Sequence, residues 1–100
     1  METKRIYMQE TQELEVVDIE STIGITNAAK VILFNDDWHT FDEVINQLIK
    51  AIKCTRQRAE ELTLEVHNKG KACVYEGDLQ DCLRVSSILE EIALHTQVEY

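Results

Sequence analysis

The sequence predicts an α+β fold with the element order β-α-α-β-α-β, in which three helices pack on one face of a small three-stranded sheet. Two patterns support this order. Short apolar runs of strand length end in polar residues or glycine, and longer amphipathic segments follow Thr or Asp residues that can cap a helix. A third observation is the length of 100 residues, which leaves room for one domain.

The first strand is predicted at Val31–Phe34, a continuous apolar run that ends at the polar residues 35–37. A helix then begins after Thr40. Its hydroxyl can accept from the backbone of Glu43 while the Glu43 carboxylate reaches back, which is a capping box. Six residues at helical spacing give this helix one apolar face: Phe41, Val44, Ile45, Leu48, Ile49 and Ile52.

The remaining elements follow from similar signals. A second helix is expected to begin after Thr55 and to end at Gly70, and a strand is predicted at Ala72–Tyr75. Asp78 caps a third helix, and Gln97–Tyr100 alternates as a short last strand. The third helix is expected to bury Cys82, Val85, Ser86, Leu89, Ile92 and Ala93.

The predicted domain covers residues 30–100. Residues 1–29 are interpreted as a mobile or weakly structured N-terminal extension, because their hydrophobic alternation is weak. Within them, Arg5–Met8 and Leu14–Ile19 could form short strands, but the pattern does not require it.

The net charge of −9 disfavours nucleic acid and anionic membranes as partners, because both attract basic surfaces. No apolar run approaches the roughly 20 residues that span a bilayer, and no secretory signal is visible. Three widely spaced cysteines without a CxxC motif favour a reducing compartment. We therefore expect a cytoplasmic protein, a monomer by default.

The densest polar cluster, residues 35–39, lies between the first strand and the first helix. Its Asn and two Asp side chains provide an acceptor-rich patch that suits an ammonium group or a metal cation, but the same residues also form ordinary turns. His67, near the end of the second helix, is a second candidate, although a histidine there can simply complement the helix dipole. A metal site built from Asp36, Asp37, His39 and His67 has no supporting spacing signature.

Catalysis is not expected. The sequence has no GxSxG motif, no glycine-rich phosphate loop and no pattern of an activated cysteine. We predict a binding protein with no cofactor.

Two motifs together resemble the ClpS family, the adaptors of the bacterial Clp protease. The first is the strand Val31–Phe34 followed by Asn35, Asp36 and Asp37, and the second is the segment 65–72, with sequence EVHNKGKA. The resemblance covers about residues 30–100 in family-like order and spacing. It implies the fold of the C-terminal domain of the ribosomal stalk protein, which agrees with the element order given above.

The resemblance also implies a function, the recognition of N-degrons. ClpS proteins bind the free α-amino group and a large hydrophobic first residue of a substrate, and deliver the substrate to the ClpA unfoldase. By resemblance, Asn35, Asp36 and His67 hold the amino group, and Asp37 lies beside them. The implied walls of the side-chain pocket are Phe41, Val44, Thr63, Val66 and Leu94.

This chain departs from the commonest ClpS pattern at three positions. His39 replaces a threonine that contacts the substrate backbone, so that contact could differ or gain pH dependence. Phe41 replaces a methionine that gates the pocket, and it is stiffer and bulkier. Thr63 stands where a methionine often lines the pocket, which leaves more room and a hydroxyl group.

The surface that contacts the unfoldase is assigned by resemblance to Asp78, Asp81 and Arg84. The extension 1–29 is similar in character to the flexible arm that ClpS proteins use in delivery. Two other functions remain open: a ClpS-like regulator that docks on a Clp unfoldase without binding N-degrons, and a small metal-binding protein. Intact Asn35, Asp36 and His67 favour the adaptor over the regulator.

Overall fold

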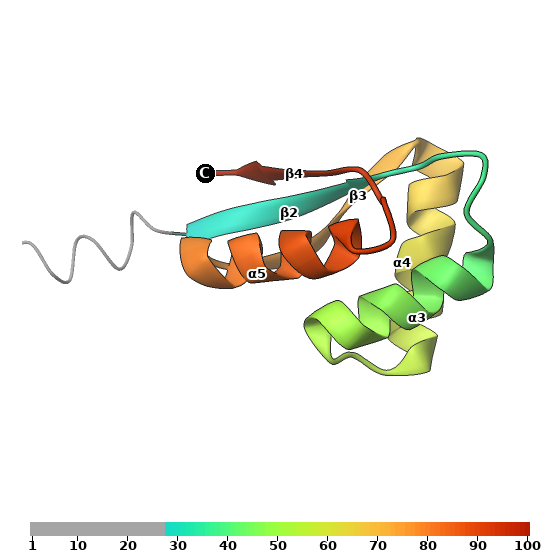
Figure 1. Cartoon of the computed structure of the whole chain (residues 1–100), viewed down its shortest axis with the longest axis horizontal. Helices are drawn as coiled ribbons and strands as arrows, with labels where there is room; N and C mark the ends of the chain where they lie inside the picture. The colour runs from blue at the N-terminus through green and yellow to red at the C-terminus, as the bar shows by residue number, and fades with distance from the viewer. Residues whose placement is uncertain (1–27) are drawn as a thin grey trace, which may run out of the picture.

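The computed structural model describes residues 28–100 (Figure 1). Its element order is β-α-α-β-α-β, which confirms the predicted α+β class. The bounds are β2 Ala28–Phe34, α3 Phe41–Ile52, α4 Arg56–Lys69, β3 Lys71–Asp78, α5 Leu79–Glu90 and β4 Thr96–Glu99.

The sheet has the strand order β3-β2-β4, so the first described strand lies in the centre. Both neighbours run antiparallel to β2. The register against β3 shifts once, because Val31 lies opposite Tyr75 whereas Ile32 lies opposite Cys73. This shift is a β-bulge, which adds local twist to the ladder.

The helices cover the sheet unequally (Figure 1). Helix α5 packs along β2 and β3, and α4 packs against β3, whereas α3 packs mainly on α4 and α5. The prediction that the three helices pack together on the sheet is confirmed. Helix α3, however, lies further from the strands than α4 and α5 do. The largest fully buried side chains are Leu33, Leu48, Leu62, Leu89, Val31, Val85 and Cys82.

All three predicted N-caps are present. Thr40 accepts from the Glu43 backbone at 3.1 Å, and the Glu43 carboxylate accepts from the Thr40 backbone at 2.8 Å, which completes the capping box. Thr55 caps α4 by accepting from Arg58, and Asp78 caps α5. These caps satisfy backbone N–H groups that have no partner inside the helix.

Several predicted boundaries need correction. Strand β2 begins at Ala28, so two residues assigned to the extension belong to the sheet; Ala29 is buried, and only Ala28 remains exposed. The strand at Ala72–Tyr75 is part of a longer strand that runs from Lys71 to Asp78. Residues 1–27, with the two short strands considered there, lie outside the described residues.

The end of α5 also differs from the prediction. The helix stops at Glu90, so Ile92 and Ala93 lie in the following turn instead of on its buried face. The Ala93 backbone has a φ of 66°, a left-handed conformation that does not continue a helix. The last strand is Thr96–Glu99, one residue earlier than predicted.

Within residues 28–100, no helix combines the length and apolar character needed to cross a lipid bilayer.

Candidate functional site

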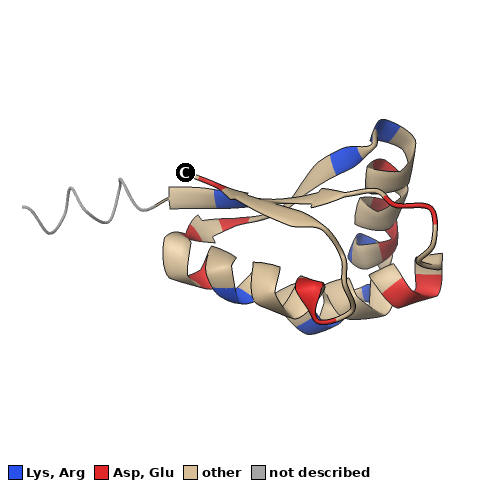
Figure 2. Ribbon diagram, turned by 45° about the horizontal axis from the view of Figure 1, so that its top comes forward, with Lys and Arg blue, Asp and Glu red and all other residues tan. Residues whose placement is uncertain are grey.

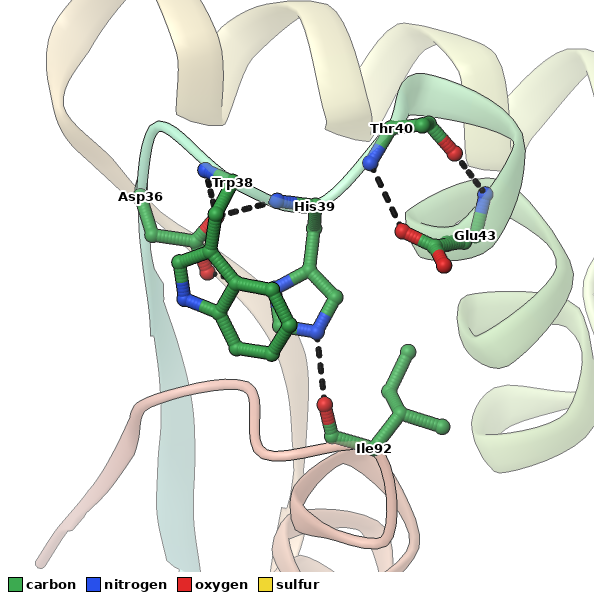
Figure 3. A network of polar contacts seen from close by, with 6 residues as sticks. All are labelled: Asp36, Trp38, His39, Thr40, Glu43 and Ile92. Atoms are coloured by element: carbon green, nitrogen blue, oxygen red, sulfur yellow. Dashed lines mark hydrogen bonds and ion pairs between the residues drawn. The ribbon is translucent and has the colours of Figure 1, made fainter.

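The loop between β2 and α3 is organised by the Asp36 carboxylate (Figure 3). Its Oδ1 accepts from the backbone N–H groups of Trp38 at 3.2 Å and His39 at 3.0 Å. Its Oδ2 lies 2.7 Å from Nδ1 of His39. Asp36 is therefore more than the free countercharge that the sequence suggested, because it also holds the loop together.

The His39 ring connects this loop to the turn after α5 (Figure 3). Nδ1 contacts Asp36, and Nε2 lies 2.6 Å from the carbonyl oxygen of Ile92. The His39 side chain is only 3% exposed, and the Trp38 ring lies against it with 3.7 Å between ring centroids. The position expected to contact a ligand backbone instead points inward.

The two ring contacts favour a charged His39. Both nitrogens face oxygen acceptors, and only an imidazolium has two N–H donors to satisfy them. Burial lowers the pKa of His39, but the Asp36 carboxylate, the Ile92 carbonyl and the charges of Asp36 and Glu43 outweigh it, so the pKa is raised. Burial raises the pKa of Asp36, but the hydrogen bonds from His39 and Trp38 and the charge of His39 lower it overall.

The second part of the site is the C-terminal end of α4. Gly70 caps this helix with a φ of 87° and donates from its backbone to Val66. The Gly70 carbonyl accepts from the Asn35 backbone at 2.9 Å, so the helix end is joined to the end of β2. His67, in the last turn of α4, is thereby placed near the β2–α3 loop.

These two parts enclose a cavity of about 270 Å³. It is lined by every residue predicted for the amine site and its pocket: Asn35, Asp36, Asp37, His39, Phe41, Val44, Thr63, Val66, His67 and Leu94. The structure thus brings together side chains from the β2–α3 loop, two helices and the turn before β4. The acceptor side chains come from the β2–α3 loop and the end of α4. The apolar walls come from α3, α4 and the turn between α5 and β4.

Two wall residues have constrained side chains. The Phe41 ring is 42% exposed and meets the His67 ring nearly edge-on, with 5.2 Å between centroids. Thr63 is buried, and its hydroxyl donates to the Ala59 carbonyl at 2.7 Å. The sequence predicted an additional hydroxyl group in the pocket. In the structure this hydroxyl donates its hydrogen bond to the backbone of its own helix instead.

Leu33 and Phe34 also line the cavity, and sequence reasoning did not include them. Both residues end β2 directly before the polar cluster, and this position could have indicated that they line the same site. The Ile92 carbonyl was also missed. No side-chain pattern predicts it, because it is a backbone group in the turn between α5 and β4.

The candidate metal ligands do not form a metal site. Among residues 28–100, no group of three or more His, Cys, Asp and Glu side chains is arranged to hold an ion. His39 has both ring nitrogens engaged, which leaves it no free lone pair for a metal.

The three residues assigned to unfoldase contact lie around the start of α5. Asp78 accepts from the Asp81 backbone at 2.9 Å as the N-cap, and Arg84 approaches Asp81 at 3.9 Å. Arg84 also donates to the Ala51 carbonyl at the end of α3. Leu94 of the cavity follows the other end of α5, a 12-residue helix about 18 Å long.

Acidic residues continue from the β2–α3 loop into the first turn of α3, where Asp42 and Glu43 follow Asp36 and Asp37 (Figure 2). A small α+β domain in which acceptor side chains and apolar residues line one cavity belongs to the class of binding modules. The family model described as "ATP-dependent Clp protease adaptor protein ClpS" matches residues 26–98. The chain belongs to the ClpS family.

Individual relatives agree with this assignment. The chain is 39% identical over 66 residues to the ClpS adapter protein of Shewanella pealeana, covering 64% of this chain and 65% of that protein. It is 38% identical over 58 residues to the human E3 ubiquitin-protein ligase UBR2, covering 58% of this chain and 3% of the ligase. The chain thus spans a small segment of the ligase and somewhat less than two thirds of the bacterial adapter.

A solved structure has the same fold. The structure of Agrobacterium tumefaciens ClpS2 bound to L-phenylalaninamide superposes with a TM-score of 0.69 at 18% sequence identity. The match covers 73% of this chain and 95% of that one.

Proposed function

We propose that this chain binds the free α-amino group and the large hydrophobic first residue of N-degron substrates, and delivers them to a Clp unfoldase. The observation that carries the proposal is the joining of acceptor side chains and apolar walls around one cavity. A single N-terminal residue has the complementary chemistry, with a cationic amine on one side and an apolar side chain on the other.

The amine site follows from hydrogen-bond capacity. An α-ammonium group has three donors and needs about three acceptors. The Asn35 side-chain oxygen, the Asp36 carboxylate and a ring nitrogen of His67 supply them in this proposal. Asp36 Oδ2 accepts one hydrogen bond from His39 and keeps capacity for another. An acetylated amine carries no charge and has fewer donors, so it would leave acceptors unpaired.

The cavity size supports one buried side chain. About 270 Å³ lies just below the roughly 300–1,000 Å³ typical of sites for drug-sized ligands. Burial of a Leu or Phe side chain there contributes about 1.5–3 kcal/mol. L-phenylalaninamide, held by the structurally similar ClpS2, combines a free amine with a benzyl group and so has the proposed ligand chemistry.

Delivery is proposed from the family assignment and from the separation of the two surfaces. Asp78, Asp81 and Arg84 would contact a ClpA-type unfoldase, at the N-cap and in the N-terminal half of α5. Residues 1–27 would assist delivery as a tethered arm that raises the local concentration of the adaptor. We also retain the proposal of a cytoplasmic location, because Cys54, Cys73 and Cys82 are free thiols.

Binding is tested with peptides that are identical except at residue one, each with a free and an acetylated amine. Fluorescence anisotropy should show affinity for Leu, Phe, Tyr or Trp with a free amine, and a large loss on acetylation or with a first Asp. Equal affinity for the free and acetylated forms would contradict the amine site.

A separate experiment tests docking. Asp81→Asn should weaken binding to ClpA and leave peptide affinity unchanged, whereas the control Glu61→Gln, an exposed change on α4, should alter neither. A chain that binds ClpA but no free-amine peptide would instead be the ClpS-like regulator.

A further inference from the structure

The His39 side chain connects the β2–α3 loop to the turn after α5, and both segments line the cavity. The β2–α3 loop carries Asn35 and Asp36 of the proposed amine site, and the turn after α5 carries Leu94, a buried wall residue. The His39 ring is hydrogen-bonded to Asp36 in the β2–α3 loop and to the Ile92 carbonyl in the turn after α5 (Figure 3).

The turn that His39 holds is conformationally strained. Ala93, between Ile92 and Leu94, has a φ of 66°, a conformation that is costly for a residue with a side chain. Such a conformation persists when the surroundings fix it. The contact of His39 with the Ile92 carbonyl, directly before Ala93, is one of the bonds that fix the turn. The others are the backbone bonds from Ala93 to Glu90 and from Phe34 to His95.

We propose that His39 is a positioning residue whose imidazolium form holds the Leu94 wall in register with the amine site, so that selectivity for the first side chain depends on the charge of His39. This inference rests on the proposed function and adds to it a residue that sets specificity. Neutral His39 has a single N–H donor, so either Asp36 or the Ile92 carbonyl would face a ring lone pair. The turn after α5 would then lose its hydrogen bond from His39, and the cavity would discriminate less between first side chains.

The electrostatic surroundings of the ring agree with this assignment. Asp36 in the loop and Glu43 in the first turn of α3 act on it as negative charges. The turn after α5 contributes the Ile92 carbonyl, and the ionisable residue of α4 that lines the cavity is His67, which contacts Phe41. Trp38 covers the ring from solvent and can favour its positive charge through a cation–π contact.

Trp38 also provides a direct readout of His39. It is the one tryptophan of the chain, and its ring centroid lies 3.7 Å from that of His39. An imidazolium quenches indole fluorescence more strongly than neutral imidazole does. As pH is raised, wild-type fluorescence should therefore increase in one transition. Its midpoint should lie above 6.5, the ordinary pKa of histidine, because the pKa of His39 is raised. The transition should be absent in His39→Gln and retained in His95→Gln, a control on a histidine in the adjoining segment.

Selectivity is measured as the ratio of affinities for two free-amine peptides that begin with Leu and Trp. The ratio cancels the ionisation of the peptide amine. In the wild type the affinity ratio should fall about tenfold as pH is raised through the fluorescence transition, which is equivalent to about 1.4 kcal/mol. His39→Gln should have the low ratio at every pH, whereas His95→Gln should keep a ratio that changes with pH, because its His39 is intact.

The possible outcomes separate this inference from the proposed function. A wild type that discriminates free from acetylated amines but has a pH-independent Leu-to-Trp ratio would overturn the positioning role alone. A wild type with no preference for free amines would overturn both. A fluorescence transition that persists in His39→Gln would show that another group titrates, and would likewise overturn the assignment.

Discussion

At the residue scale, Asp36 shapes the loop, pairs with His39 and is proposed to attract the ligand amine. Its Oδ1 accepts two backbone N–H groups and shapes the loop, while its charge is proposed to attract the ligand amine. Replacement by alanine would remove both and disturb the loop. Asparagine keeps an acceptor oxygen for the backbone but removes the charge, so Asp36→Asn is the informative variant.

We expect Asp36→Asn to weaken binding of a free-amine peptide by about 2 kcal/mol, or about thirtyfold, because a charge-assisted hydrogen bond is lost. Anisotropy measures this affinity, and circular dichroism checks that the variant stays folded. The matched control is Asp42→Asn, an exposed change in the first turn of α3. Unchanged affinity in a folded Asp36→Asn protein would exclude the proposed role.

The Asp36–His39 pair should also make stability depend on pH. His39 has a raised pKa in the folded state, so its contribution is complete below its ordinary value of 6.5 and is lost as pH rises through the folded value. Asp36 has a lowered pKa, so its contribution is complete above 3.8 and is lost as pH falls through the folded value.

The stability difference between wild type and His39→Gln should therefore be greatest between pH 3.8 and 6.5. Within this window we expect the variant to lose about 2 kcal/mol of unfolding free energy, because two partly buried acceptors lose a charged donor. Urea unfolding at several pH values measures the difference. A constant difference from pH 4 to pH 9 would argue against a charged His39.

At the scale of elements, Gly70 joins α4 to the site loop. Its φ of 87° lies in the left-handed region, and an added Cβ would meet no atom within 4 Å. The cost of Gly70→Ala is therefore one of backbone conformation, about 1–2 kcal/mol. Thermal or urea unfolding should show this loss.

Peptide affinity should also fall in Gly70→Ala, because the Gly70 carbonyl accepts from Asn35 beside the amine site. Lys69→Ala, one residue earlier at an exposed helical position, is the control and should change stability little. Equal stability of the two variants would contradict the importance of the left-handed cap.

At the scale of the whole molecule, the described fold holds every proposed ligand group between residues 33 and 94. We expect a chain that lacks residues 1–25 to keep its peptide affinity, because this deletion ends before β2 begins at Ala28. Delivery to ClpAP should be impaired if the deleted segment acts as a tethered arm.

One truncated protein is tested in two assays, peptide anisotropy and degradation by reconstituted ClpAP. Loss of peptide affinity would place the deleted residues in the folded domain. Unimpaired degradation would contradict an arm that assists delivery.

The sequence by itself determined the element order, the three helix caps and the ClpS resemblance. Local patterns carry these features: Thr40 and Glu43 cap α3 within one turn, and apolar spacing marks the core face of each helix. Most residues of the cavity could be named because the motifs at 35–37 and 65–72 occur together, and the structure places these residues around one space, with Leu33 and Phe34 in addition.

Only the tertiary structure decided how the side chains and backbone groups of those residues are arranged. The inward His39 side chain, the occupied Thr63 hydroxyl and the Ile92 carbonyl depend on contacts between segments far apart in the chain or on backbone groups. The start of β2 at Ala28 likewise depends on pairing with Asp78, fifty residues later. Local periodicity contains no information on such long-range hydrogen bonds, because each partner satisfies the same local pattern whether or not the other is near.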